Sequence, residues 1–66
     1  MSSSSDAAAL SSASSLLQDL ISRVIEVAGH YEGTDREQLA HQLHEVERAM
    51  RMAARQLDHA VRSLGG

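Results

Sequence analysis

The chain has 66 residues, a formal charge of −3 and no cysteine or proline. A domain this short is marginal alone and usually needs a disulfide, a metal or oligomerisation, and the lack of cysteine excludes the first. The acidic balance disfavours nucleic acid as a partner, since nucleic-acid-binding domains are typically basic. No apolar run approaches the length of a membrane span and the N-terminus lacks the layout of a secretion signal, so a cytoplasmic location is expected.

The N-terminal segment 1–14 is rich in Ser and Ala. Serine side chains compete for backbone hydrogen bonds outside a helix, so the sequence predicts a flexible tail here. Leu10 and Ala13 continue the apolar pattern of the following segment in phase, which leaves room for partial helix formation on a partner. A helical hairpin is predicted over 15–66.

The first predicted helix spans 15–32. Ser15 and Gln18 form an S-x-x-Q capping box at its start. Its apolar residues are spaced alternately by three and four, as in a heptad repeat: Leu17, Leu20, Val24, Val27 and Tyr31. The apolar stripe is widened by Leu16, Ile21, Ile25 and Ala28. The stripe then covers roughly half the helix circumference, which is more than one neighbouring helix can hide.

A turn is predicted at 33–34 and a second helix at 35–64. Gly33 suits the left-handed residue that ends a helix, and Thr34 with Glu37 forms another capping box. The second heptad series is Leu39, Leu43, Val46, Met50, Ala53, Leu57, Ala60 and Leu64. A short connection makes the helices antiparallel neighbours. The predicted fold is all-α, an antiparallel two-helix hairpin that completes a four-helix bundle as a homodimer.

Few residues suggest chemistry. His41 and His44 are three apart, but the predicted seam places them on the opposite, exposed face, so no metal site is predicted. The serines have no histidine and acid arranged around them, and the carboxylates are expected at the surface, where nothing raises their pKa. The sequence therefore predicts no catalytic residue, no cofactor and no enzymatic activity.

The arginines of the second helix form a possible anion-binding stripe. They are Arg48, Arg51, Arg55 and Arg62. Acidic residues four positions earlier, Glu47 and Asp58, favour local ion pairs with Arg51 and Arg62 instead. Both interpretations stay open: a phosphate-binding face, or a solvated face with local pairs.

The pattern as a whole favours a non-enzymatic protein–protein interaction module that associates with itself. The predicted interface comprises Leu17, Leu20, Ile21, Val24, Ile25, Val27, Leu43, Val46, Met50, Ala53, Leu57 and Val61. One alternative is an obligate small subunit or co-chaperone that docks a partner's amphipathic helix. A second alternative is a regulator that binds a phosphate-bearing ligand or nucleic acid through the arginine stripe.

Overall fold

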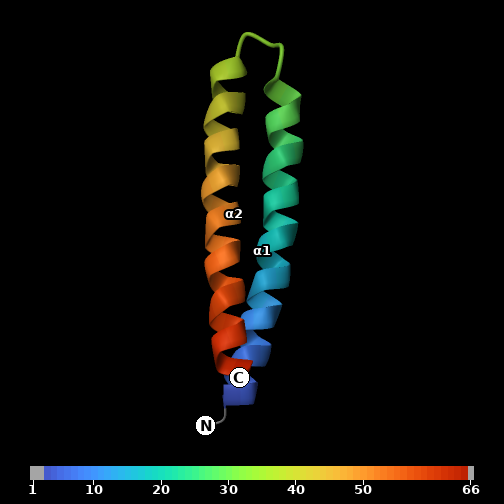
Figure 1. The fold of residues 1–66 in the computed structure, drawn as a ribbon. Helices are drawn as coiled ribbons and strands as arrows, with labels where there is room; N and C mark the ends of the chain where they lie inside the picture. The colour runs from blue at the N-terminus through green and yellow to red at the C-terminus, as the bar shows by residue number, and fades with distance from the viewer. Residues whose placement is uncertain (1–2, 66) are drawn as a thin grey trace.

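A computed structural model describes residues 3–65, which form two antiparallel helices packed side by side (Figure 1). Helix α1 spans Ser3–Tyr31 and helix α2 spans Glu37–Gly65, each 29 residues long. The start of α1 and the end of α2 lie together at the end of the hairpin opposite the turn. No strand is present within the described residues. The prediction of an all-α two-helix hairpin is thereby confirmed.

The N-terminal segment is helical from Ser3, which agrees with the partial helix that the in-phase Leu10 and Ala13 allowed and differs from the flexible tail. Helix α1 begins at Ser3 rather than near Ser15, and only residues 1 and 2 of the expected tail lie outside the described part of the chain. Ala7, Leu10 and Ser14 are half-buried, because this segment packs against the C-terminal half of α2. Tertiary packing thus outweighs the weak helix propensity of serine. Ser15 is inside the helix, where no free N-terminal amide remains for it to cap.

The turn occupies 32–36 rather than the predicted 33–34. Gly33 has a φ of +75°, which confirms the left-handed conformation expected of it. The Thr34 hydroxyl accepts a hydrogen bond from the Arg36 amide at 3.1 Å, as a cap does. The Thr34 amide donates to the Tyr31 carbonyl at 3.2 Å. That amide is therefore already satisfied without Glu37, which the predicted capping box had assigned to it.

The two helices face each other along one seam of heptad a and d positions. From α1 it contains Ala7, Leu10, Ser14, Leu17, Ile21, Val24, Ala28 and Tyr31; from α2 it contains Ala40, Leu43, Glu47, Met50, Ala54, Leu57 and Val61. The fully buried members are small apart from one: Ile21, Ala28, Ala40 and Ala54. Three alanines and one isoleucine make a thin core, so burial within the chain supplies little hydrophobic stabilisation.

The predicted heptad series is shifted by one residue at every second position. The seam uses Ile21 and Ala28 where Leu20 and Val27 were expected. In α2 it uses Ala40, Glu47, Ala54 and Val61 where Leu39, Val46, Ala53 and Ala60 were expected. An apolar stripe half a helix wide contains two series with the same three–four spacing, which share every d residue. Periodicity alone cannot say which series faces the helix of the same chain.

The hairpin is a rod. Its Cα extents are 52 × 14 × 13 Å and its radius of gyration is 15.3 Å, against about 11 Å for a compact globule of this length. Neither helix, over the residues that the structure describes, is both long enough and apolar enough to cross a bilayer.

Candidate interaction surface

One long edge of the hairpin is polar, and we call it the polar edge. It carries a hydrogen bond between Glu32 of the turn and His44 of α2, and another between Ser14 of α1 and Asp58 of α2. Glu32, His44 and Asp58 each follow directly after a d residue of the seam, which is heptad position e. The e flanks of both helices therefore meet along this edge, and their g flanks meet along the opposite one.

A charged network spans the polar edge near the turn. His44 Nε2 lies 2.6 Å from Glu32 Oε2, and His44 Nδ1 lies 3.2 Å from Glu47 Oε1. Arg51 Nε donates to Glu47 Oε2 at 2.8 Å. The hydrogen bond to Glu32, and then that to Glu47, raises the pKa of His44. The hydrogen bond from Arg51, followed by that from His44, lowers the pKa of Glu47. The Glu47–Arg51 pair confirms the local ion pair predicted from their spacing, whereas the contacts of His44 were not predicted, because His44 was assigned to the outer face.

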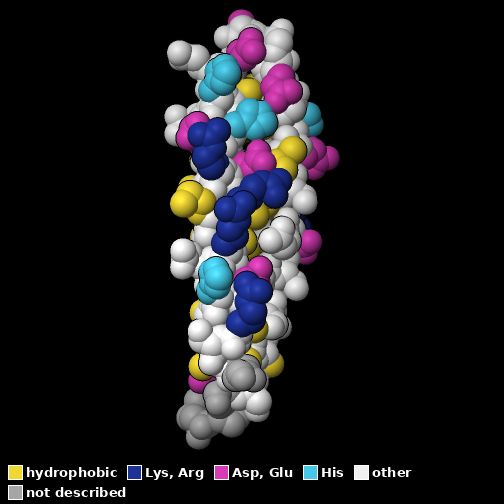
Figure 2. Space-filling view, in the orientation of Figure 1, with side chains coloured by type: hydrophobic (Ala, Val, Ile, Leu, Met, Phe, Trp, Pro, Cys, Tyr) yellow, Lys and Arg dark blue, Asp and Glu magenta, His cyan; other side chains and the backbone are white. Residues whose placement is uncertain are grey.

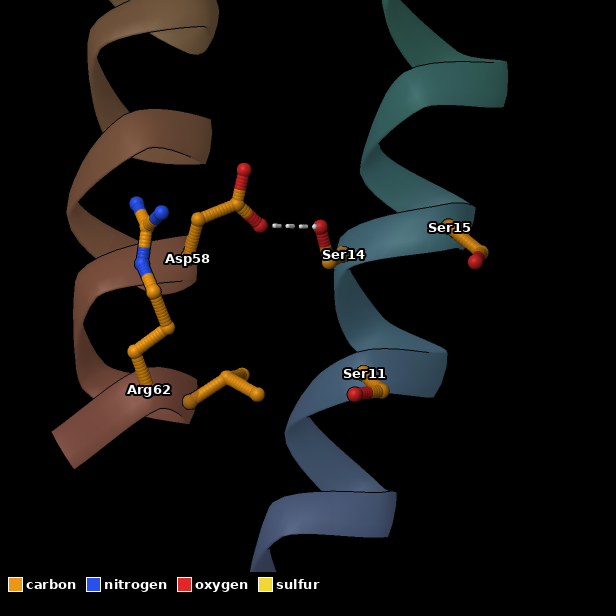
Figure 3. A pocket seen from close by; sticks show the side chains of 6 residues that line it. Ser11, Ser14, Ser15, Asp58 and Arg62 are labelled. Atoms are coloured by element: carbon orange, nitrogen blue, oxygen red, sulfur yellow. Dashed lines mark hydrogen bonds between the residues drawn. The ribbon is translucent and has the colours of Figure 1, made fainter. Parts of the chain in front are cut away.

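A shallow groove lies at the other end of the polar edge (Figure 3). It has a volume of about 390 Å³ and is lined by Ser11, Ser14, Ser15, Asp58, Val61 and Arg62. The Ser14 hydroxyl donates to Asp58 Oδ1 at 3.0 Å across the groove. The Asp58 carboxylate would repel an anion entering beside Arg62, so the groove is a weak candidate for phosphate binding.

The arginine stripe lies on the polar side of α2. Figure 2 shows arginine and histidine side chains gathered along this face of the hairpin. Arg48 and Arg51 bond to Glu45 and Glu47 of the same helix, whereas Arg55 and Arg62 form no ion pair within the described residues. Half of the stripe is thus locally neutralised, and phosphate binding by the whole stripe stays a prediction.

The opposite long edge is apolar, and we call it the apolar edge. Its g positions are Ala13, Leu20 and Val27 of α1 and Leu39, Val46, Ala53 and Ala60 of α2. Three of the large side chains are open to solvent, Leu20 at 39%, Val27 at 43% and Val46 at 38% exposure, whereas Leu39 is half-buried. On its outer margin Leu16 is 59% exposed. Exposed apolar side chains that follow one edge make it the candidate interaction surface of the hairpin.

The residues predicted as an interface are divided by the structure among three places. Seven lie in the seam within the chain: Leu17, Ile21, Val24, Leu43, Met50, Leu57 and Val61. Four lie on the apolar edge: Leu20, Val27, Val46 and Ala53. Ile25 follows the d residue Val24 and so lies on the polar edge, 37% exposed.

The histidines do not assemble a metal centre. Among the described residues no group of three or more His, Asp or Glu side chains is placed to hold a metal ion. His41 is exposed, while His44 is half-buried beside the seam, contrary to the expectation that both face solvent. One turn of helix separates them in sequence, but it is His44 that reaches Glu32 of the turn that follows α1.

Comparison of the chain with protein-family models, with curated proteins and with solved structures gives no match. The fold alone therefore defines the class, a small all-α antiparallel helical hairpin with one polar and one apolar long edge. Its function has to be argued from these two edges.

Proposed function

We propose that the chain is a non-enzymatic interaction module that associates with a second copy of itself through the apolar edge. Two hairpins pack face to face and form an antiparallel four-helix bundle. The observation that carries the proposal is the exposure of Leu20, Val27 and Val46 along one edge, whereas the polar edge exposes Ile25 beside its ion pairs. In a four-helix bundle, an edge with large apolar side chains is expected to face the interior, and an edge with ion pairs is expected to face solvent.

The presence of two heptad series supports this assembly. The series containing Ile21 and Ala54 is used within the chain, and the series containing Leu20 and Ala53 is left uncovered. Each helix of a four-helix bundle contacts two neighbours, so it needs one such series for each. A hairpin that functioned alone would need only the first.

The available area also supports a dimer. The face of the rod that carries the apolar edge is 52 Å long and 14 Å wide, about 700 Å², and the g residues from Leu39 to Ala60 occupy about 32 Å of this length. A stable protein–protein interface buries about 800 Å² on each partner. One face of the rod is therefore large enough, provided that nearly its whole length takes part.

Sedimentation equilibrium of matched charge variants tests the proposal. We expect the wild-type chain to be a dimer at micromolar concentration. Val46→Asp should weaken association at least a hundredfold, since it leaves an unpaired charge in the bundle interior. Met52→Asp is the control, because Met52 is 62% exposed on the outer face of the same helix. A folded wild-type monomer, or equal weakening by both variants, would contradict the proposal.

Docking of another protein's amphipathic helix would use the same edge. In that case the purified wild-type chain would be a poorly ordered monomer whose helicity rises when the partner is added. Circular dichroism of the sample used for sedimentation separates this outcome from self-association.

A further inference from the structure

Side-chain size changes along the apolar edge. Two contacts, Ser14 with Asp58 and Glu32 with His44, join residues whose numbers sum to 72 and 76, so residues of the two arms lie level when their numbers sum to roughly that value. Val27 is then level with Val46 near the turn, Leu20 with Ala53 at the middle, and Ala13 with Ala60 toward the open end. The g residues are therefore larger near the turn, where Leu39 also lies, and smaller near the open end, where Leu16 lies on the margin.

A symmetric dimer can join two such edges in two ways. With both turns at the same end, one layer of the bundle contains four valines, from Val27 and Val46, and another contains four alanines, from Ala13 and Ala60. Interhelical distance follows side-chain size, so the helices would have to splay toward the turns. The tight packing of a bundle core opposes such a taper.

With the turns at opposite ends, the layers have similar volumes. Leu20 and Ala53 lie at the symmetry axis and meet their own copies. Val27 and Ala13 each lie seven residues from Leu20, so each Val27 faces a small Ala13 of the second copy. Val46 faces Ala60 for the same reason, since both lie seven residues from Ala53.

Charges beside the apolar edge favour the same arrangement. Arg23 is exposed on the margin of this edge, and Asp19 is exposed on the outer face of α1, at the heptad position that Met52 has in α2; neither forms an ion pair within the described residues. Around an axis through Leu20, Arg23 lies about 3 Å along the helix direction from Asp19 of the second copy. Two reciprocal pairs can then form. In the other arrangement Arg23 is level with Ala49 of α2, whose margin is uncharged.

Resting on the proposed self-association, we infer that the second copy docks on the apolar edge with its turn at the opposite end. The axis passes beside Leu20 and Ala53, and Asp19 and Arg23 of each copy pair with Arg23 and Asp19 of the other.

Distances between spin labels distinguish the two arrangements. The chain has no cysteine, so Gln38→Cys and Met52→Cys each introduce one label site. Gln38 lies fifteen residues from Ala53 toward the turn. Labels at position 38 should be about 45 Å apart in the inferred dimer, and about 20–25 Å apart with both turns at one end. Position 52 is the control, because it lies near the middle of the hairpin. The distance between its two labels is therefore short in both arrangements.

Each outcome of the labelling has one meaning. A long distance at position 38 with a short one at position 52 supports the inferred arrangement. Short distances at both positions overturn it and leave self-association intact. If no distance between labels of two copies is detected and sedimentation shows a monomer, the proposed function is overturned and the inference with it.

Charge reversal tests the marginal pairs independently. Asp19→Arg or Arg23→Asp alone places like charges together twice in the dimer, and each should weaken association roughly threefold to tenfold at low salt. The double variant restores the pairs in reverse and should return to within about twofold of wild type. Circular dichroism verifies that each variant is helical. Dimer affinity unchanged in both single variants would overturn the assignment of these pairs.

Discussion

His44 has a partner on each ring nitrogen, and both partners are carboxylates. A neutral imidazole donates through one nitrogen only, so both contacts are hydrogen bonds only in the protonated ring. One of the carboxylates, Glu32, comes from the turn that follows α1, and the other, Glu47, from the seam of α2. The protonation state of one side chain therefore acts on the junction between the helices.

We expect the hairpin to lose stability as the pH rises above 6.5. The folded-state pKa of His44 is raised above its ordinary value of 6.5, so its contribution is complete below pH 6.5 and is lost as the pH rises through the raised value. Thermal melts of wild type and His44→Gln between pH 5.5 and about 8.5 measure this, and only the wild type should show the loss. His41→Gln is the control, since exposed His41 should leave the profile unchanged.

The opposite limit comes from Glu47, whose folded-state pKa is lowered from 4.5 by Arg51 and His44. Its contribution is present above pH 4.5 and is lost as the pH falls through the lowered value. The network as a whole is thus most stabilising in mildly acidic solution. A wild-type profile identical to that of His44→Gln would show that the contacts of His44 do not stabilise the fold.

The contacts of His44 were beyond the reach of the sequence pattern for a definite reason. A shift of one residue in the heptad series moves His44 from the outer face to the seam margin, and Glu47 from the surface to the seam. Glu47 is also a residue type that composition assigns to solvent. Its side chain retains 20% exposure and reaches Arg51, which makes this placement tolerable.

At the scale of the elements, the turn depends on Gly33. Its φ of +75° lies in the region that L-residues avoid, and no neighbouring atom lies within 4 Å of an added Cβ. Gly33→Ala should therefore destabilise the hairpin by backbone strain alone, by about 1 kcal/mol. For a chain of this size, this destabilisation should lower Tm by about 4–8 °C, measured by circular dichroism.

Gly29 supplies the matched control of opposite sign. It lies inside α1, where an added Cβ also meets nothing within 4 Å. Gly29→Ala should raise stability by about 0.5–1 kcal/mol, since alanine loses less backbone entropy in a helix. Equal effects of the two substitutions would contradict the role given to the left-handed turn.

The turn and the extent of α1 were not equally predictable. Gly33 is a local signal, because the conformation that it permits is a property of one residue. The start of α1 is a tertiary property: serine-rich residues 3–14 are helical because Ala7 and Leu10 have α2 to pack against. The capping box at Ser15 is a valid local signal that the longer helix overrides. Equal helix lengths also remove the uncovered end of α2 that a short α1 would leave.

At the scale of the whole molecule, the rod exposes more surface than its mass requires. The chain has an accessible surface of 4873 Å², whereas a compact monomer of 7.1 kDa would have about 4,100 Å². The width of the apolar stripes, read from the sequence, already implied that a single neighbouring helix cannot cover each stripe. What the sequence could not supply is the division of each stripe, and the burial of the side chains locates that division in α1 between Leu20, 39% exposed, and Ile21, 2% exposed.

The thermal transition should depend on protein concentration if the apolar edge is covered by a second copy. Unfolding of a dimer releases two chains, so a tenfold increase in concentration stabilises the assembly by about 1.4 kcal/mol. For two chains of this length we expect an increase in Tm of about 5 °C per tenfold. Melts over a hundredfold concentration range measure it, with Val46→Asp for comparison. A wild-type Tm that stays constant over that range would mean that the thin core of Ile21 and three alanines suffices alone, and that the uncovered heptad series has another occupant or none.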